Sequence, residues 1–287
     1  MANKKRAKKL PKVTAENYYD PKIQMAYMGA SQFKAFERCE AAAMAELTGE
    51  WTTAKTPALL IGGYVDAYFA GEMEQFKEQN PEIFSSRPPY GLKAEFKVAN
   101  KIISRMERDK LYMLLMAGKK QVIKTGFIAG VPFKIKIDVL LNADECKQVV
   151  KDFPNAAEAL GMCDGAIVDQ KLMANFESVW SSEEQDRITF IEYWGYDTQG
   201  AIYQEIEGNM LPFIINAGTK EDEPDLGAFY IRDEDLQEKL HEVEDKAPRY
   251  QAIKDGKIAP VRCEKCKYCR ATKRMQTIAD YKELIWR

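Results

Sequence analysis

Histidine is nearly absent from this chain of 287 residues, and long apolar runs are missing altogether. The single histidine, His241, lies in an acidic stretch that predicts a solvent-exposed helix. Ser–His or Cys–His nucleophilic catalysis therefore has little support, because it needs a base placed beside the nucleophile. No apolar run approaches the roughly 20 residues that span a bilayer. The first residues also lack the apolar centre of a secretory signal, so we expect a cytoplasmic protein.

The composition is that of an ordinary globular protein. Apolar residues make up 46% of the chain and charged residues 30%, and the formal net charge is −2. These values are typical of a folded, soluble domain, and the length is sufficient to bury a full hydrophobic core. No internal repeat is visible, which argues against a solenoid or a propeller.

The charges are placed unevenly along the chain. Residues 1–12 hold six basic groups and no acidic group, and residues 261–287 hold eight basic and three acidic groups. Residues 219–255 hold twelve acidic and six basic groups. Basic ends on a near-neutral body can contact phosphate, although residues 1–12 are equally consistent with a solvated tail. We expect a basic, flexible arm over 1–20, a folded domain over 21–260, and a basic segment over 261–287 that packs back on the domain.

Sequence periodicity predicts helices in the first part of the chain and a mixed sheet after it. One helix is expected from about Ser31 to Gly49, and another after the Thr56–Pro57 cap. Further predicted elements are an apolar-periodic stretch at 92–116, strands at 121–128 and 133–141 around a turn, an irregular segment at 142–164, and a strand at 165–172. A helix at 186–207, strands at 211–217 and 227–231, and an acidic helix at 233–246 follow. This order indicates an α/β fold with a mixed central sheet flanked by helices.

Two aspartates lie on neighbouring predicted strands, and a lysine follows the second. Asp138 alternates with apolar residues in the strand at 133–141, and Asp169 and Lys171 end a short apolar run. The Asp-x-Lys triplet also occurs at Asp20, Asp255 and Asp280, but none of those copies ends a buried strand. Two carboxylates beside an ammonium group suit metal-assisted phosphodiester cleavage. Ordinary surface aspartates on an exposed edge are the alternative.

Polar groups on two predicted helices could join this site. Gln199 and Tyr203 are spaced i, i+4 and therefore share one helix face. They could reach a metal or a phosphate, although Tyr203 could equally be a half-buried core residue. Asp66 follows two glycines in an apolar stretch, which suggests either a third metal ligand or an acid on the solvent side of an amphipathic helix.

Cysteines give a second signal near the end of the chain. Cys263, Cys266 and Cys269 form a Cys-x₂-Cys-x₂-Cys run. In a reducing compartment such clusters indicate Zn²⁺ or an iron–sulfur cluster, and a reduced, metal-free tail is the alternative. Cys146 and Cys163 are expected to be ordinary buried thiols.

Taken together, these motifs resemble the PD-(D/E)xK nuclease superfamily in its RecB-like and lambda-exonuclease-like branch. The similarity is greatest to phage and prophage proteins related to exodeoxyribonuclease VIII, and it covers about residues 28–272. Its motifs, in the order of the family, are the Ser31–Cys39 segment, Gly62-x-x-x-Asp66, Asp138, Asp169-Gln170-Lys171 and Gln199-x-x-x-Tyr203. The RecB branch usually has histidine where Asp66 stands, and the longer spacing between Asp138 and Asp169 implies an insertion at 142–164.

The resemblance implies a restriction-endonuclease-like core with helical N-terminal additions and a DNA exonuclease that depends on Mg²⁺ or Mn²⁺. The implied metal ligands are Asp66, Asp138, Asp169 and the backbone carbonyl of Gln170. Lys171 would orient the attacking water or stabilise developing charge, and Gln199 and Tyr203 would position Lys171 or the DNA.

The resemblance also extends to cofactors and partners. Some RecB-like nucleases close a [4Fe–4S] site with one N-terminal and three C-terminal cysteines, which makes Cys39 the expected fourth ligand. The last cysteine spacing is shorter here, so Zn²⁺ stays open. The implied partners are double-stranded DNA ends and a single-strand annealing protein, in a bacterial or phage-infected cell. A site- or structure-specific endonuclease, a catalytically idle DNA-binding scaffold, and the oligomeric state all stay open.

Overall fold

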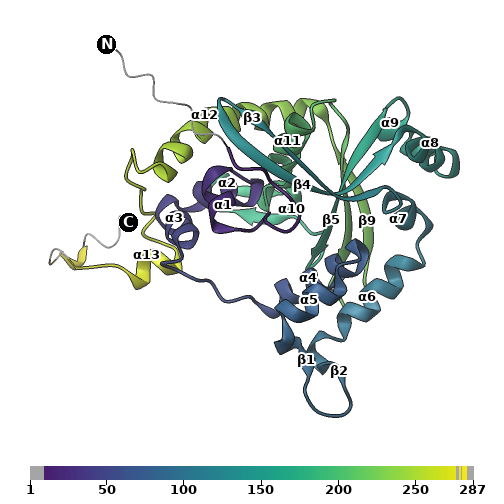
Figure 1. Cartoon of the computed structure of the whole chain (residues 1–287), viewed down its shortest axis with the longest axis horizontal. Helices are drawn as coiled ribbons and strands as arrows, with labels where there is room; N and C mark the ends of the chain where they lie inside the picture. Colours follow the sequence, from purple (N-terminus) through teal and green to yellow (C-terminus); the bar gives the residue numbers. More distant parts are fainter. Residues whose placement is uncertain (1–9, 276–277, 279, 283–287) are drawn as a thin grey trace.

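A five-stranded mixed sheet forms the centre of the computed structural model, which describes residues 10–275, 278 and 280–282 (Figure 1). The strand order is β3-β4-β5-β8-β9. The strands are β3 (Lys119–Ile128), β4 (Val131–Asn142), β5 (Gly165–Met173), β8 (Phe213–Thr219) and β9 (Leu226–Ile231). Only the β5–β8 pair is parallel. The predicted α/β class with a mixed sheet is therefore confirmed.

Each face of the sheet carries its own hydrophobic core. On one face, Phe33, Ile202 and Leu236 pack against β4 and β8. Their helices are α2 (Ala30–Arg38), α11 (Tyr196–Glu207) and α12 (Asp233–Lys254). On the other face, Val65 and Ile102 pack against the same sheet. The helices there are α4 (Pro57–Ala70), α6 (Val98–Glu107), α7 (Lys110–Leu115) and α8 (Ala143–Asp152).

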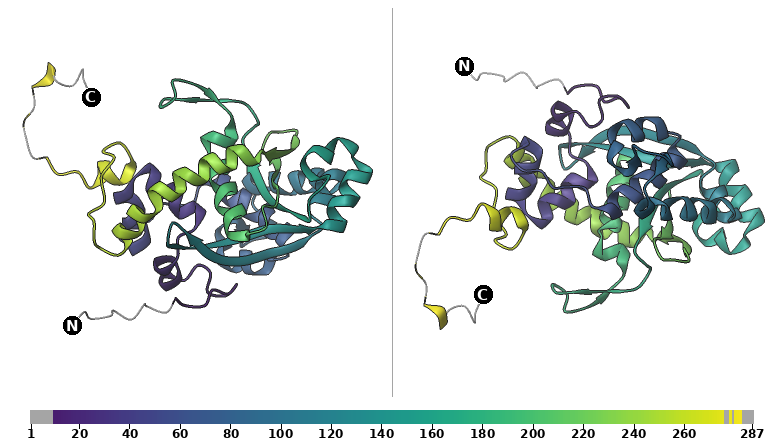
Figure 2. Two further views of the ribbon diagram at one scale, coloured as in Figure 1. Left: turned by 90° about the horizontal axis from the view of Figure 1, so that it is seen from above. Right: turned by 90° about the horizontal axis from the view of Figure 1, so that it is seen from below.

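Smaller elements complete the fold. They are the helices α1 (Pro21–Ala26), α3 (Glu40–Thr48), α5 (Met73–Gln79), α9 (Ala157–Leu160), α10 (Phe190–Tyr193) and α13 (Lys267–Ala271), the short helices at Pro81–Ile83, Ala94–Phe96 and Pro154–Ala156, and the strand pairs β1 (Phe84–Ser85) with β2 (Gly91–Leu92) and β6 (Val179–Ser181) with β7 (Asp186–Ile188). The β6–β7 hairpin projects from the body (Figure 2). Within the described part of the chain, no helix combines the length and apolarity that crossing a bilayer requires.

The helix expected from Ser31 to Gly49 is broken in two at Cys39. Cys39 is extended, and it begins α3 by accepting a hydrogen bond from Ala42 N at its Sγ atom. Its side chain is buried against Cys269. A contact with the C-terminal segment therefore overrides a helical periodicity that is locally continuous.

The segment at 142–164, which we expected to be irregular, is largely helical. Asn142 and Glu145 form a capping box at the start of α8, which satisfies free backbone N–H groups there. Cys146 and Val149 then face the core. The expectation was wrong because the amphipathic pattern is short and no turn signal separates it from the preceding strand.

The prediction of one continuous helix over 186–207 was also wrong for the first half of that range. Residues 186–188 form β7, and α11 begins only after Gly195, whose φ is +62°. The stretch at 92–116 contains the short helix at Ala94–Phe96 and then α6 and α7, which are separate because Asp109 caps α7 at Tyr112 N. The acidic helix, expected to end at 246, continues through Pro248 to Lys254, since its apolar face stays buried beyond the proline.

The expected basic arm at 1–20 is described only from residue 10. Tyr18 is buried, and its carbonyl accepts a hydrogen bond of 2.7 Å from Lys134 Nζ. Residues 10–20 thus pack on the domain, and the basic groups at positions 4–9 lie outside the described residues.

Candidate active site

The two predicted aspartates lie where two sheet strands separate. The antiparallel ladder between β4 and β5 ends at the pair Val139–Val168. Asp138 and Asp169 are the next residue on each strand. Instead of continuing the ladder, Gln170 N donates a hydrogen bond of 3.0 Å to Asp138 Oδ2. Strand separation therefore places two carboxylates side by side at the level of the sheet.

Asp169 is held by partners on both of its oxygens. Its side chain is 2% exposed, and Oδ1 accepts a hydrogen bond of 2.7 Å from Gln199 Nε2. Oδ2 forms an ion pair with Lys171. Burial alone would lower the pKa of Lys171, but the charges of Asp169 and Asp138 raise it above its ordinary value. Lys171 is therefore held as a cation beside the carboxylates.

A small cavity lies on the other side of Asp138. Its volume is about 10 Å³, and Asp66, Asp138 and Gln170 are among the residues that line it. That space is comparable to a single water molecule or ion. The Asp66 side chain keeps contact with solvent, yet the packed protein around it and then the charge of Asp138 raise its pKa to about 8. Burial and then the charge of Asp169 raise the pKa of Asp138 to about 7.

The three aspartates are near one another without forming one tight ligand set. In the described part of the chain, only a cluster of four cysteines brings three or more ligand atoms within 4.8 Å of one another. Asp66 lines the small cavity with Asp138, whereas Asp169 is held by Gln199 and Lys171. Gln170 Nε2 is buried and has no hydrogen-bond partner among the described residues, which leaves a free donor next to these oxygens.

Tyr203 contributes differently from our expectation. Its hydroxyl donates a hydrogen bond of 3.1 Å to the backbone carbonyl of Lys136 on β4, and neither Lys171 nor Asp169 is its partner. Of this pair, Gln199 thus holds the carboxylate of Asp169, and Tyr203 holds β4. The prediction was that Gln199 and Tyr203 position Lys171 or the DNA. Gln199 instead bonds Asp169, the ion-pair partner of Lys171, and the contact with DNA stays a prediction.

A second lysine beside Lys171 escaped the sequence-based selection. Lys34 on α2 lies 5.2 Å from the centre of the Tyr196 ring, and Lys171 lies 5.4 Å from the same centre. Burial and then the like charge of Lys171 lower the pKa of Lys34 to about 8. The usable signal was its place in the Ser31–Cys39 motif, but no spacing in the sequence linked it to Tyr196.

The four cysteines expected to share one site lie together. The Sγ atoms of Cys39, Cys263, Cys266 and Cys269 are all within 4.8 Å of one another. The Cys39–Cys269 and Cys263–Cys269 sulfur distances are 3.6 and 3.9 Å. Figure 1 shows the C-terminal α13 lying beside α3, far from both in sequence. Cys146 and Cys163 are elsewhere, the first on the buried face of α8 and the second just after α9.

Backbone amides point at three of these sulfurs. Ala42 N, Cys266 N and Cys269 N donate to the Sγ atoms of Cys39, Cys263 and Cys266 at 3.5, 3.3 and 3.4 Å. Burial opposes ionisation of Cys263, but hydrogen bonds from the backbone of Cys266 and Lys265 lower its pKa to about 6. Because the thiolate is the metal-binding form, the segment has the chemistry of a metal site.

Residues 29–153 and 159–272 match the model of a family described as "PDDEXK-like domain of unknown function (DUF3799)". The first segment contains Asp66 and Asp138, and the second contains Asp169 and Lys171. The chain belongs to this PDDEXK-like family. Family membership confirms the superfamily that the motifs indicated. The break at 154–158 covers the short helix at Pro154–Ala156 and the start of α9, within the segment where we expected an insertion.

A solved structure is similar over nearly the whole PDDEXK-like chain. It is a crystal structure from Eubacterium rectale whose name is "Putative exonuclease", with 40% sequence identity and a TM-score of 0.81. The similarity covers 96% of this chain and 98% of that chain. No curated protein matches the chain. The narrower likeness to the exodeoxyribonuclease VIII group stays a proposal.

Proposed function

We propose that the chain is a metal-dependent DNA exonuclease whose catalytic centre is formed by Asp66, Asp138, Asp169 and Lys171. The observation that carries the proposal is the strand separation that places Asp138 and Asp169 together, with Lys171 held as a cation against them. The similarity to a structure named as an exonuclease supports the same class of activity.

The residues at this centre fit a hard divalent cation. Carboxylate and carbonyl oxygens are the ligands that Mg²⁺ and Mn²⁺ prefer, and Asp66, Asp138, Asp169 and the carbonyl of Gln170 supply them. When bound, such an ion polarises a phosphate and lowers the pKa of an attacking water. Burial and then a neighbouring carboxylate raise the pKa values of Asp66 and Asp138, and the charge of Lys171 offsets this only in part.

The other residues orient the reacting groups. Lys171 donates to the carbonyl of Gln170 at 3.2 Å and pairs with Asp169. From there its ammonium can hold the water or stabilise the negative charge that develops on the phosphate. Gln199 fixes the rotamer of Asp169, and Tyr203 fixes β4 two residues before Asp138. Both act as positioning residues.

We further propose that the substrate is a double-stranded DNA end resected during phage-type homologous recombination, in the cytoplasm of a bacterial or phage-infected cell. Support comes from the order of the sequence motifs and from the name of the similar structure. The product strand would pass to a single-strand annealing protein. An assembly of several subunits, as in toroidal relatives, is compatible with this role.

The decisive experiment uses end-labelled linear DNA and a covalently closed circle of the same sequence, with Mg²⁺ or with EDTA. An exonuclease degrades the linear DNA only, whereas a site- or structure-specific endonuclease also cuts the circle. Asp138→Ala serves as the inactive control. Wild-type protein that cuts neither substrate with Mg²⁺ or Mn²⁺ would identify a catalytically idle scaffold and overturn the proposal.

For the cysteine site we propose Zn²⁺ in preference to a [4Fe–4S] cluster. A Zn–S bond of about 2.3 Å in a tetrahedron implies sulfurs about 3.8 Å apart, and the observed 3.6 and 3.9 Å agree with that spacing. A cubane cluster places four irons between its cysteine sulfurs and so needs a wider arrangement. About one zinc per chain in a colourless protein is the expected result, and a brown protein with about four irons would reverse the assignment.

A further inference from the structure

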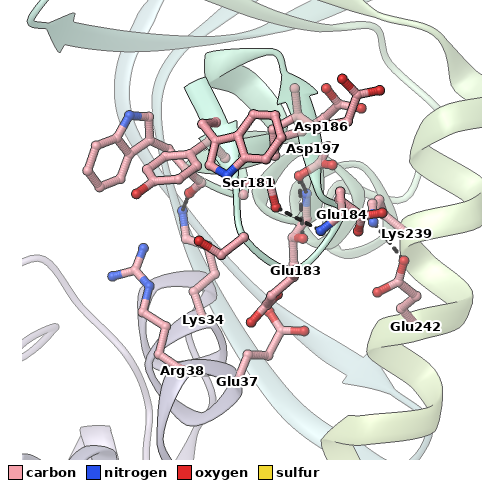
Figure 3. Close-up of a pocket in the computed structure, with 18 of the residues that line it drawn as sticks. Lys34, Glu37, Arg38, Ser181, Glu183, Glu184, Asp186, Asp197, Lys239 and Glu242 are labelled. Atoms are coloured by element: carbon pink, nitrogen blue, oxygen red, sulfur yellow. Dashed lines mark hydrogen bonds and ion pairs between the residues drawn. The ribbon is translucent and has the colours of Figure 1, made fainter. Parts of the chain in front are cut away.

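A large cavity opens beside the catalytic centre on the side of Lys34. Its volume is about 940 Å³, and it lies between α2, the β6–β7 hairpin, the end of α10 and α12 (Figure 3). Lys34 lines the cavity, and the ammonium groups of Lys34 and Lys171 both lie near the ring of Tyr196. A single aromatic ring thus links a cavity-lining residue to the catalytic lysine. Lys34 and the Tyr196 ring therefore separate the cavity from Lys171.

Three large aromatic side chains stand open to solvent on this cavity. Trp180 is 57% exposed, Trp194 46% and Tyr193 44%. Tyr193 and Trp194 meet edge to face, with ring centres 5.1 Å apart. Aromatic side chains that border one cavity are a feature that can mark an interaction site. Trp180 is at the base of a projecting hairpin, where core packing does not require an indole.

The position of Lys34 is fixed by its neighbours. Its Nζ donates a hydrogen bond of 3.2 Å to the carbonyl of Trp194. A Cβ atom on Gly195 would lie 2.9 Å from Lys34 Cδ, so glycine is needed there for the close approach as well as for its positive φ. One turn further along α2, Arg38 is exposed and forms no ion pair among the described residues. The wall from Lys34 to Arg38 is thus a short basic stripe, in which the charge of Glu37 is paired with Lys246 at 2.8 Å.

The opposite wall is acidic. Glu183, Glu184 and Asp186 lie at the turn of the hairpin and form no ion pair with any described residue. Figure 3 shows Arg38 and Lys34 on the left, with Glu242 and Lys239 on the right, where they are paired. A phosphate backbone is repelled by the acidic wall and attracted to the basic stripe. Electrostatics therefore allow a polyanion along one side of the cavity only.

We propose that Trp180, Trp194 and Arg38 form a platform for the unpaired end of a DNA strand, which leads that strand past Lys34 to the catalytic centre. Bases stack on exposed aromatic faces while cations hold the phosphates between them, which is how single strands are bound without sequence preference. A duplex hides its base faces in the helix and cannot use such a platform. The inference rests on the proposed nuclease function, because it assigns the cavity to the same substrate.

Binding of a fluorescein-labelled single-stranded oligonucleotide, measured by anisotropy in EDTA, tests the platform without cleavage. Trp180→Ala and Trp194→Ala should each weaken binding about five-fold or more, and Arg38→Met should also reduce its salt dependence. Tyr90→Ala and Arg87→Met, at exposed positions on the distant β1–β2 loop, should bind as wild type. Thermal melting shows whether each variant folds. Trp180 lies on the hairpin, so its substitution should disturb the fold less than the other substitutions.

A second readout separates this platform from a merely structural role. Wild-type protein should bind a duplex with a single-stranded tail more tightly than a blunt duplex, and Trp180→Ala should lose most of that preference. Equal oligonucleotide affinity for wild type, Trp180→Ala and Trp194→Ala overturns the platform even when the wild type degrades DNA. No binding of the oligonucleotide by the wild type also overturns it. Binding without any cleavage in Mg²⁺ overturns the nuclease function and leaves the platform standing.

Discussion

The oxygen site and the sulfur site of this protein are built on opposite energetic terms. At the oxygen site, burial and then the charge of Asp138 raise the pKa of Asp66, and burial and then the charge of Asp169 raise the pKa of Asp138, so ionisation of these carboxylates opposes folding. At the cysteine site, amide N–H groups donate to sulfurs that join α3 to the C-terminal segment. They lower the pKa of Cys263, whereas burial raises the pKa of the other three thiols. Active sites commonly sacrifice stability for chemistry. The comparison indicates that removing one site should cost activity and removing the other should cost stability.

The largest expected effect is the loss of cleavage in Asp138→Ala. Activity on linear DNA should fall at least about 10³-fold, which corresponds to about 4 kcal/mol of transition-state stabilisation. The melting temperature in EDTA should stay the same or rise, since a repelling carboxylate is gone. Asp144→Ala, at an exposed position on α8, is the matched control. Turnover near that of the wild type would show that the active site lies elsewhere.

Lys171→Met sharpens the same contrast. It should abolish cleavage to a similar extent, but it should also lower stability, because Asp169 would remain buried without its partner. Lys147→Met, whose lysine is exposed on α8, should change neither property. A Lys171→Met protein with full stability would mean that Asp169 is neutral or otherwise compensated in the fold.

Cys39→Ser should show the reverse pattern. We expect loss of the bound metal and a decrease of about 3 kcal/mol in the free energy of unfolding, since the site closes a long loop and its binding energy adds to folding. Activity per folded molecule should change much less. Urea unfolding under reducing conditions, with metal analysis, measures both. Cys163→Ser is the control, and full metal content in Cys39→Ser would remove Cys39 from the site.

Asp66→Asn tests whether Asp66 belongs to the oxygen site at all. If it is a ligand, the Mg²⁺ concentration that gives half-maximal activity should rise about ten-fold. The maximal rate at saturating Mg²⁺ should change less. A Mg²⁺ dependence identical to that of the wild type would make Asp66 a structural acid on α4.

The smallest expected effect is a pH-dependent gain of stability in Asp138→Asn. Because the folded protein raises the pKa of Asp138 to about 7 from an ordinary value of 3.8, the folded state binds the proton more tightly. Wild-type stability in EDTA should therefore fall as pH rises from about 4 to 7. Asparagine resembles the protonated form, so the variant should be the more stable protein at pH 8 and equal in stability to the wild type at pH 4. Added Mg²⁺ should favour the wild type, and a constant difference across pH would contradict this account.

The sequence predicted the parts of the fold in which local pattern and tertiary environment agree. Asp138 could be selected because it lies on the polar side of an alternating strand, and Asp169 because it ends a short apolar run. The β3–β4 hairpin has a clear turn signal. The break at Cys39 and the hydrogen bond from Tyr203 to β4 could not be predicted, since both depend on partners distant in sequence. The β6–β7 hairpin escaped because three-residue strands carry almost no periodicity. Lys34 was overlooked for a similar reason, since its importance arises from Tyr196, which only the fold brings near.

The pairing of Cys39 with Cys269 has a consequence for the order of synthesis. The two residues are 230 positions apart, so at about 5–20 residues per second Cys39 leaves the ribosome tens of seconds before its partner exists. All five strands of the central sheet are made in that interval. The thiol of Cys39 must therefore stay reduced until the whole sheet has been translated. A chain that terminates early therefore lacks the contact between Cys39 and Cys269, and the C-terminal segment does not hold α3. Such incomplete molecules would be open to proteolysis.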